Sequence, residues 1–93
     1  MVAWGLVRQD QLKVKGETKA YASSEHGRRH FCAACGTALF YTNGVIFPGQ
    51  IDVQVCTLDD PDEIPPQPQI QVAERIGWME RAHELPSFER YPG

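Results

Sequence analysis

The sequence contains few cysteines and no surplus of positive charge. Its three cysteines are odd in number and too few for the disulfide framework of a small secreted protein. The net charge is −3, and the only local cluster of basic residues is Arg28-Arg29-His30. Nucleic-acid binding needs a basic surface that neutralises several phosphates. We therefore expect no nucleic-acid partner.

Long apolar stretches and common catalytic motifs are also missing. No run approaches the roughly 20 apolar residues that cross a bilayer, and the N-terminus has no charged segment followed by an apolar one. We therefore expect a soluble, cytoplasmic protein with no membrane partner. The sequence has no Ser-His-Asp arrangement, no glycine-rich phosphate loop and no His-Glu-x-x-His motif. No catalytic residue is assigned on these grounds.

The length predicts one small domain, residues 1–93. A chain of this size buries only roughly 60–65% of the surface that its unfolded form exposes. A bound structural metal ion or a partner chain would therefore add to the stability of the fold. Hydrophobic residues make up 42% of the sequence, which is typical of a globular domain and not of a disordered chain.

The feature with the clearest chemistry is the stretch Phe31-Cys32-Ala33-Ala34-Cys35-Gly36. Two cysteines two residues apart form the tight turn that grips a tetrahedral zinc in many small domains, and Gly36 would let the chain leave this turn with a positive φ. A redox pair has the same spacing, but it normally opens a helix after a strand. Because residues 38–41 predict a strand, we favour zinc ligation by Cys32 and Cys35 over a redox pair or two free thiols.

The two further ligands of a structural zinc are not evident. Cys56 is a candidate, although a lone cysteine in a strand is more often a small buried hydrophobe. His30 and His26 lie close before the pair, in a polar stretch that predicts solvent exposure, and His83 is expected at the surface. Three acidic residues are predicted to be solvated turn residues and not a metal site: Asp59, Asp60 and Asp62.

Short apolar runs separated by turn residues predict a mostly β fold with little helix. Residues 1–7 are apolar enough for a strand buried on both faces. Lys15-Gly16-Glu17 predicts a hairpin between strands at 11–14 and 18–21, followed by a polar loop at 23–29.

A second hairpin is predicted at Asn43-Gly44, between strands at 38–41 and 45–47. The strand predicted at 51–58 alternates, with Ile51, Val53 and Val55 on one face and Cys56 on the other.

The C-terminal third is rich in proline. Prolines at 61, 65, 66 and 68 exclude a helix or an inner strand and predict an extended surface connection. Residues 70–72 then predict a strand, followed by an irregular or one-turn helical segment. Phe88 is expected to pack as an anchor. Trp4 and Trp78 are expected in the core, because a small domain needs its large aromatic side chains for packing.

The order of these features resembles the glutathione-dependent formaldehyde-activating family, also called the Gfa or CENP-V-type domain. The resemblance extends over nearly the whole chain. The segments that carry it are Val2-Ala3-Trp4, Gly16, Tyr21-x-Ser23-Ser24, Arg29-x-Phe31-Cys32-x-x-Cys35-Gly36, Leu58-Asp59-Asp60-Pro61, Val72-x-Glu74-Arg75-Ile76-x-Trp78 and Leu85-Pro86-x-Phe88.

This resemblance implies a mostly β, Mss4-like (β-tent) fold built as sheets around zinc. It also implies binding of glutathione or a related thiol, and carbon–sulfur lyase activity that condenses glutathione with formaldehyde to S-hydroxymethylglutathione. By the same resemblance, Cys32 and Cys35 are half of a structural zinc site. Family members carry further cysteines ahead of the region that corresponds to Met1: a Cys-x-Cys pair that completes this site, and a Cys-x-Cys-x-x-Cys cluster that holds the catalytic zinc.

None of those five cysteines is in this sequence. The sequence therefore predicts a Gfa-like domain without its N-terminal zinc-ligand segment, with an incomplete zinc site and no catalysis by this chain. One alternative is an active lyase when a longer N-terminus is present. Another is a homodimeric binding module in which two Cys32–Cys35 pairs share one zinc across a twofold axis. Edges left uncovered by the missing segment should also favour a homo-oligomer.

Overall fold

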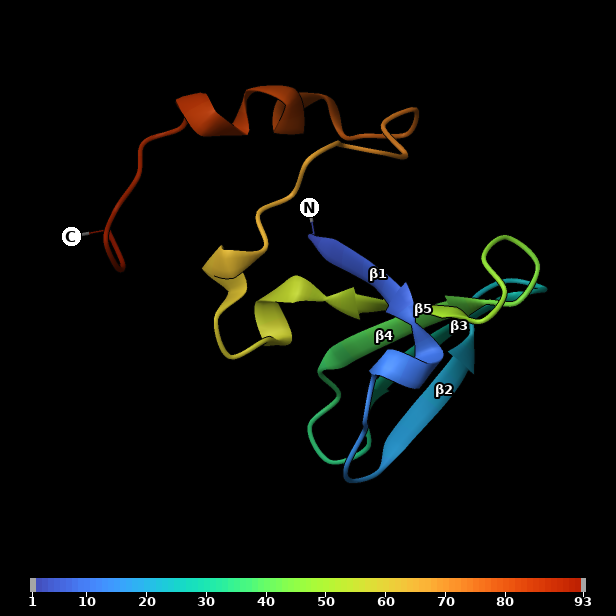
Figure 1. Cartoon of the computed structure of the whole chain (residues 1–93). Helices are drawn as coiled ribbons and strands as arrows, with labels where there is room; N and C mark the ends of the chain where they lie inside the picture. Colours follow the sequence, from blue (N-terminus) through green and yellow to red (C-terminus); the bar gives the residue numbers. More distant parts are fainter. Residues whose placement is uncertain (1, 93) are drawn as a thin grey trace.

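Five short strands form a single antiparallel sheet. The computed structural model describes residues 2–92. The strands are β1 (Trp4–Arg8), β2 (Thr18–Ala22), β3 (Gly27–Cys32), β4 (Ala38–Asn43) and β5 (Gln50–Gln54). They lie in the order β1-β5-β4-β3-β2, so β1 and β2 are the edge strands (Figure 1). The prediction of a mostly β chain with short strands and tight turns is confirmed.

Helical structure in residues 2–92 consists of short 3-10 segments. Three of them have three residues each: η1 (Gln9–Gln11), η2 (Val55–Thr57) and η3 (Pro61–Glu63). The fourth, η4 (Gly77–Glu84), is interrupted by a non-helical backbone conformation at Arg81. Across the described part of the chain, no helix has the length and apolar character needed to cross a bilayer.

Two rows of paired residues define the two faces of the sheet. Residues directly opposite one another on paired strands project to the same face, and successive residues along a strand project to opposite faces. One row crosses all five strands through Gly5, Val53, Phe40, His30 and Ala20, and we call its side the valine face. The adjacent row defines the tyrosine face and consists of Leu6, Asp52, Tyr41, Arg29 and Tyr21.

The hydrophobic core of this sheet is small. Val53 and Val55 are the buried hydrophobic residues in the described range, at 7% and 5% exposure. Both residues were predicted on one face of a strand at 51–58, but β5 ends at Gln54 and Val55 already belongs to η2. With so little apolar surface removed from water, burial within one chain contributes only modestly to stability.

The N-terminal half differs from prediction in its strand pairing. β1 is half-buried and not buried on both faces, because it is an edge strand and Leu6 is largely exposed; Met1 lies outside the described residues. β2 pairs with β3, so the predicted hairpin between 11–14 and 18–21 is wrong. The turn between β2 and β3 lies within the loop predicted at 23–29, and there Gly27 N donates a hydrogen bond to Ser24 Oγ at 2.9 Å. The last three residues of that predicted loop, 27–29, belong to β3.

The β4–β5 hairpin forms with a longer loop than predicted. Asn43 Oδ1 accepts hydrogen bonds from the backbone N–H groups of Val45 and Ile46, at 3.1 and 3.0 Å. This side-chain-to-backbone turn draws both residues out of the ladder. The predicted strand at 45–47 is therefore wrong, and pairing resumes only at Gln50.

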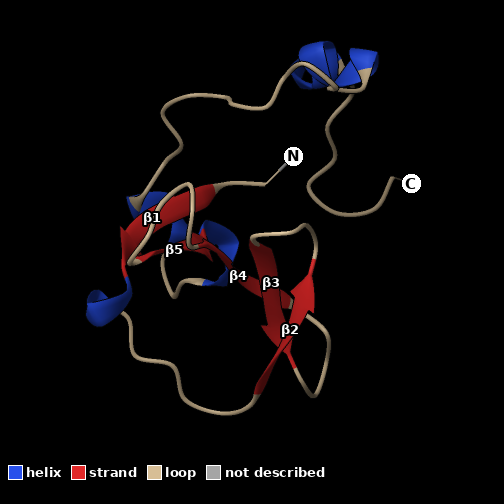
Figure 2. Cartoon of the chain, turned by 90° about the vertical axis from the view of Figure 1, so that its right-hand side faces the viewer, coloured by secondary structure: helices blue, strands red, loops and turns tan. Residues whose placement is uncertain are grey.

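Residues 59–92, which we call the C-terminal arm, run apart from the sheet in both views (Figures 1 and 2). The connection is extended from Pro65 as predicted, but residues 61–63 form the 3-10 segment η3 and residues 70–72 form no strand. Trp78 and Phe88 are 62% and 59% exposed, so the predictions of a core tryptophan and a packed anchor are wrong within a single chain. Trp4, on β1, is half-buried.

Candidate metal-binding turn and the neighbouring cavity

Cys32 and Cys35 lie at the two ends of the tight turn between β3 and β4. Cys32 is the last residue of β3, and its backbone N–H donates to the Thr37 carbonyl at 2.8 Å. Gly36 N donates to the Cys32 carbonyl at 2.9 Å, and Gly36 has φ +81°. The predicted positive φ is thus confirmed, and it closes the turn so that both thiols lie on one short loop.

Cys35 is exposed to solvent and has a polar partner. Its Sγ lies 3.1 Å from Thr37 Oγ1. Hydrogen bonds from the Thr37 side chain, then from the Thr37 backbone and from Cys32, hold the pKa of the Cys35 thiol below its usual value. A thiolate is the form that binds metals and attacks electrophiles, so this turn favours the reactive form of Cys35.

The other candidate ligands do not gather around this pair. Cys56 is exposed in η2 and donates to Gln54 Oε1 at 3.1 Å. His30 was predicted to be solvent-exposed but is half-buried on β3. Its Nε2 lies 3.1 Å from Thr42 Oγ1 of the neighbouring strand. His26 and His83 are exposed beside glutamates, and the three aspartates of residues 59–62 are exposed.

The donor set around the cysteine turn is too small for a four-coordinate zinc. In residues 2–92 no three His, Cys, Asp or Glu side chains come together as a possible metal-binding group. Cys32 and Cys35 thus offer two sulfur donors, whereas a closed structural site takes four ligands and a catalytic site takes three and an open position. A complete zinc site does not fit within the described residues.

A cavity of about 650 Å³ lies beside the first cysteine of the turn. Three segments line it: the loop of residues 12–18, the turn residues 32–34, and residues of β4, β5 and η2, including Phe40 and Val53 of the valine face. Lys13 and Lys15 supply positive charge, and Glu17 supplies one carboxylate. Its volume is in the range of small-molecule sites, and its lining combines apolar contact with cationic groups suited to an anion.

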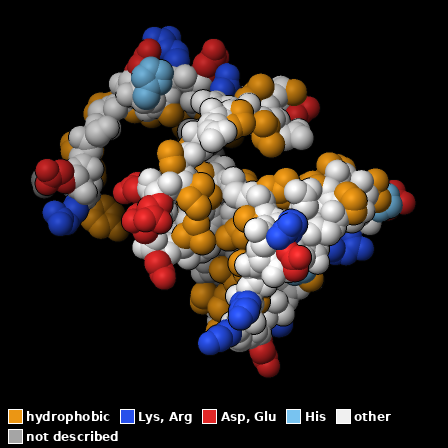
Figure 3. All heavy atoms as spheres, in the orientation of Figure 1, with side chains coloured by type: hydrophobic (Ala, Val, Ile, Leu, Met, Phe, Trp, Pro, Cys, Tyr) orange, Lys and Arg blue, Asp and Glu red, His pale blue; other side chains and the backbone are white. Residues whose placement is uncertain are grey.

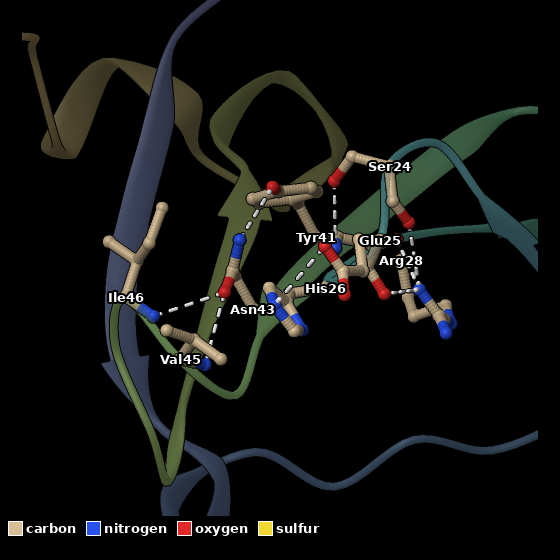
Figure 4. A network of polar contacts seen from close by, with 9 residues as sticks. Ser24, Glu25, His26, Arg28, Tyr41, Asn43, Val45 and Ile46 are labelled. Carbon is tan, nitrogen blue, oxygen red and sulfur yellow. Dashed lines mark hydrogen bonds and ion pairs between the residues drawn. The ribbon is translucent and has the colours of Figure 1, made fainter.

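A second polar cluster lies at the opposite end of the sheet from the cysteine turn (Figure 4). There Asn43 Nδ2 donates to Tyr41 Oη at 3.3 Å, and Arg28 Nη1 donates to three carbonyls of the β2–β3 turn region. A Cβ at Gly27 would come within 2.6 Å of Tyr41 Oη and 2.7 Å of Ser24 Oγ. The hydrogen bonds stay within one hairpin each, and the close approach of Gly27 to Tyr41 joins β3 to β4, so the role of this cluster is structural.

Sequence reasoning did not identify the cavity residues. Lys13 and Lys15 were assigned to a hairpin, yet residues 12–17 form a loop that curves beside the cysteine turn, where Ala33 N donates to the Glu17 carbonyl at 3.2 Å. No local pattern marks such a cavity, because its wall is assembled from segments more than 40 residues apart in the chain, from residue 12 to residue 58.

Comparison with known proteins gives one family. The family model described as "Glutathione-dependent formaldehyde-activating enzyme" matches residues 1–74, which include all five strands, the cysteine turn and the residues that line the cavity. The match ends before η4, so it does not include Trp78 or Leu85–Phe88. Neither the curated proteins nor the solved structures contain a match to this chain.

Proposed function

Because this chain belongs to the glutathione-dependent formaldehyde-activating enzyme family, we propose that the cavity beside Cys32 binds glutathione or a related thiol. We further propose that this chain does not itself catalyse the condensation of glutathione with formaldehyde. The observation that carries the first statement is the combination of the family match with a cavity beside the cysteine turn that contains two lysines.

The lining of the cavity fits the charges of a thiol tripeptide. Glutathione has two carboxylates and one ammonium group, and Lys13 and Lys15 provide two cations against one carboxylate at Glu17. Charge-assisted hydrogen bonds of this kind are stronger than neutral ones. The apolar side chains of Phe40 and Val53 are available for the aliphatic part of the ligand.

The proposed absence of catalysis follows from the small number of metal ligands in the described residues. A zinc ion with an open position lowers the pKa of a bound water or thiol and polarises a carbonyl. Such a site needs three protein ligands, and Cys32 and Cys35 are two donors. If zinc binds to this turn, we expect these two thiolates to hold it together with ligands from elsewhere. A longer polypeptide with the family's other cysteines is predicted to be an active carbon–sulfur lyase.

The proposal places the protein in a reducing compartment. Zinc binding requires reduced cysteines in the chain, and the thiol ligand must itself be reduced; the cytoplasm maintains both. The low cysteine count agrees with this choice.

Glutathione titration of the full chain, followed by calorimetry, tests the binding proposal. We expect the double substitution Lys13→Ala with Lys15→Ala to weaken binding by at least about tenfold, as loss of two charge-assisted contacts would. Lys19→Ala removes another exposed lysine, from β2 and outside the cavity lining, and serves as the matched control. Equal affinity of the double variant and the control would contradict the proposed site.

Formation of S-hydroxymethylglutathione from glutathione and formaldehyde, with zinc added, tests the second statement. We expect the chain to leave the rate at its uncatalysed value. A zinc-dependent acceleration that Cys32→Ser abolishes would overturn it.

A zinc-bridged pair of chains is a second candidate, favoured by the exposure of Cys35 on an outward turn. Two such turns would provide four thiolates for one tetrahedral ion. Elemental analysis of purified protein tests this directly. One zinc per two chains, lost in Cys35→Ser, is the expected result, and a metal-free dimer or monomer would exclude the shared site.

A further inference from the structure

The C-terminal arm exposes an unusual number of large apolar side chains. Trp78 and Phe88 are exposed, and Tyr91 is 94% exposed. The remaining exposed apolar residues of the arm are Ile64, Ile70, Val72, Ile76 and Leu85. Single exposed apolar residues are common on proteins, but eight within one segment indicate an interaction surface.

The surface area of the chain supports the same conclusion. The accessible surface is 8092 Å², whereas a folded monomer of 10.5 kDa exposes roughly 5,400 Å². The radius of gyration is 15.5 Å, compared with about 12 Å for a compact domain of this length. The excess of roughly 2,700 Å² per chain exceeds the roughly 800 Å² that each partner buries in a standard interface. The area available is therefore sufficient for a stable, extensive dimer.

The arm and the rest of the chain have opposite charge. Residues 59–92 contain eight acidic and three basic residues, whereas residues 2–58 contain four acidic and six basic residues. Two arms would repel each other, while an arm and a sheet would attract. The electrostatic preference is therefore for an arm on a sheet, and every copy of the chain carries both halves of this pair.

The tyrosine face is the part of the sheet that suits such an arm. Leu6 and Tyr21 are exposed at its two edges, and Arg29 lies with its guanidinium 5.6 Å from the centre of the Tyr41 ring between them. The alternation of the edge strands adds Arg8 and Lys19 to the same face. Asp52 is the one carboxylate in the row. Arg8 is ion-paired with Asp10 at 3.2 Å, so Arg29 and Lys19 provide the excess of positive charge over Asp52. The face therefore combines aromatic and aliphatic surface with positive charge.

The arm does not reach this face in its own chain. Its apolar side chains are exposed, and the arm stands clear of the sheet in Figure 3 as in both ribbon views. The connection contains Pro65, Pro66 and Pro68, and proline-rich segments are extended and stiff. A stiff spacer holds the arm away from its own sheet and leaves it available to another.

We propose that the C-terminal arm of one chain packs against the tyrosine face of a second copy, and that the exchange is reciprocal. Two arm–sheet contacts then form around one twofold axis, and the assembly closes as a dimer. This interface is distinct from the cysteine turn and from the cavity, and it needs no metal.

Sedimentation velocity of the full chain, in the presence of a chelator, tests the proposal over a range of concentrations. We expect a dimer that the double substitution Trp78→Ser with Phe88→Ser weakens by at least about tenfold. High salt should weaken the wild-type dimer as well, because arm and sheet carry opposite charge. The matched control is Ile46→Ser, which removes an exposed apolar side chain from the β4–β5 loop.

A mixing experiment distinguishes arm-on-sheet from arm-on-arm packing. The variant Tyr21→Ser with Arg29→Ser carries an intact arm and an altered tyrosine face. Mixed with the arm variant, it should form a heterodimer through the one intact arm–sheet contact, although each variant alone is mainly monomeric. A wild-type monomer at every concentration would overturn the proposal, and so would a dimer that the arm variant leaves unchanged. A monomer whose arm residues are protected from proteolysis would show that the arm packs on its own sheet, which also overturns it.

Discussion

Thr37 determines the state of the cysteine turn at the scale of single residues. Its hydroxyl lies 3.1 Å from the Cys35 sulfur and is the largest cause of the lowered thiol pKa. The sequence predicts that Cys35 is in a turn, but a hydroxyl two residues later has no recognised meaning in that pattern. The hydrogen bond exists because Gly36 turns the chain back on itself.

Replacement of Thr37 by valine tests this role in chelated, metal-free protein. Valine keeps the shape but removes the donor, so the pKa of Cys35 should rise toward its usual value. Because the thiolate is the nucleophile, alkylation of Cys35 by iodoacetamide should become slower at pH values below that pKa. The difference should vanish at high pH, where both proteins are fully ionised. Site-resolved mass spectrometry measures the rate, with Cys56 as an internal reference, and equal rates at neutral pH would contradict the assignment.

The hairpins set the stability of the sheet at the scale of elements. The β2–β3 and β4–β5 turns meet at Gly27, which is buried between Tyr41 Oη and Ser24 Oγ. The backbone here must approach these side chains more closely than any Cβ allows. The two turns are thus held together by this packing and by the pairing of Gly27 with Asn43 in the β3–β4 ladder.

The substitution Gly27→Ala should therefore destabilise the fold. The added Cβ must displace Tyr41 or Ser24, and overpacking of this kind costs about 1–3 kcal/mol. Urea denaturation followed by circular dichroism measures the change in the free energy of unfolding. Gly44→Ala is the control, since a Cβ there meets no atom within 4 Å. Equal stability of the two variants would show that Tyr41 and Ser24 move without cost.

At the scale of the whole molecule, few apolar side chains are buried within one chain. Val53 and Val55 are the buried hydrophobic residues of the described chain, while eight large apolar side chains of the arm are exposed. Association of two chains through the arm and the tyrosine face would bury these exposed apolar side chains.

Thermal unfolding should accordingly depend on protein concentration. If folding is coupled to dimer formation, each tenfold increase in concentration adds about 1.4 kcal/mol to the stability of the dimer. The midpoint of unfolding should then rise by several degrees over about a hundredfold range of concentration. Differential scanning fluorimetry on the wild type and on the arm variant measures this. A midpoint that does not move with concentration in the wild type would argue against coupled folding.

Local patterns predicted the turns and the strands that depend on neighbouring residues. The Cys32–Gly36 turn, the strand that becomes β4 and the placement of Ile51 and Val53 on one face of β5 all follow from short-range backbone preferences and alternation. Sequence patterns did less well where the partner of a segment lies far along the chain. Residues 18–21 were assigned as a strand but to the wrong neighbour, because pairing is decided by the whole sheet and not by the nearest glycine.

Residue identity and local spacing are enough to predict the family, the β character of the chain and the two cysteines of the turn. Three other features depend on how distant segments fold together. The tertiary structure brought the loop of residues 12–18 beside the cysteine turn to form a cavity, it put Tyr21, Arg29 and Tyr41 in one row, and it left Trp78 and Phe88 without cover. Each of these depends on contacts between distant segments, and an apolar residue has the same sequence signature whether its own chain or another one covers it.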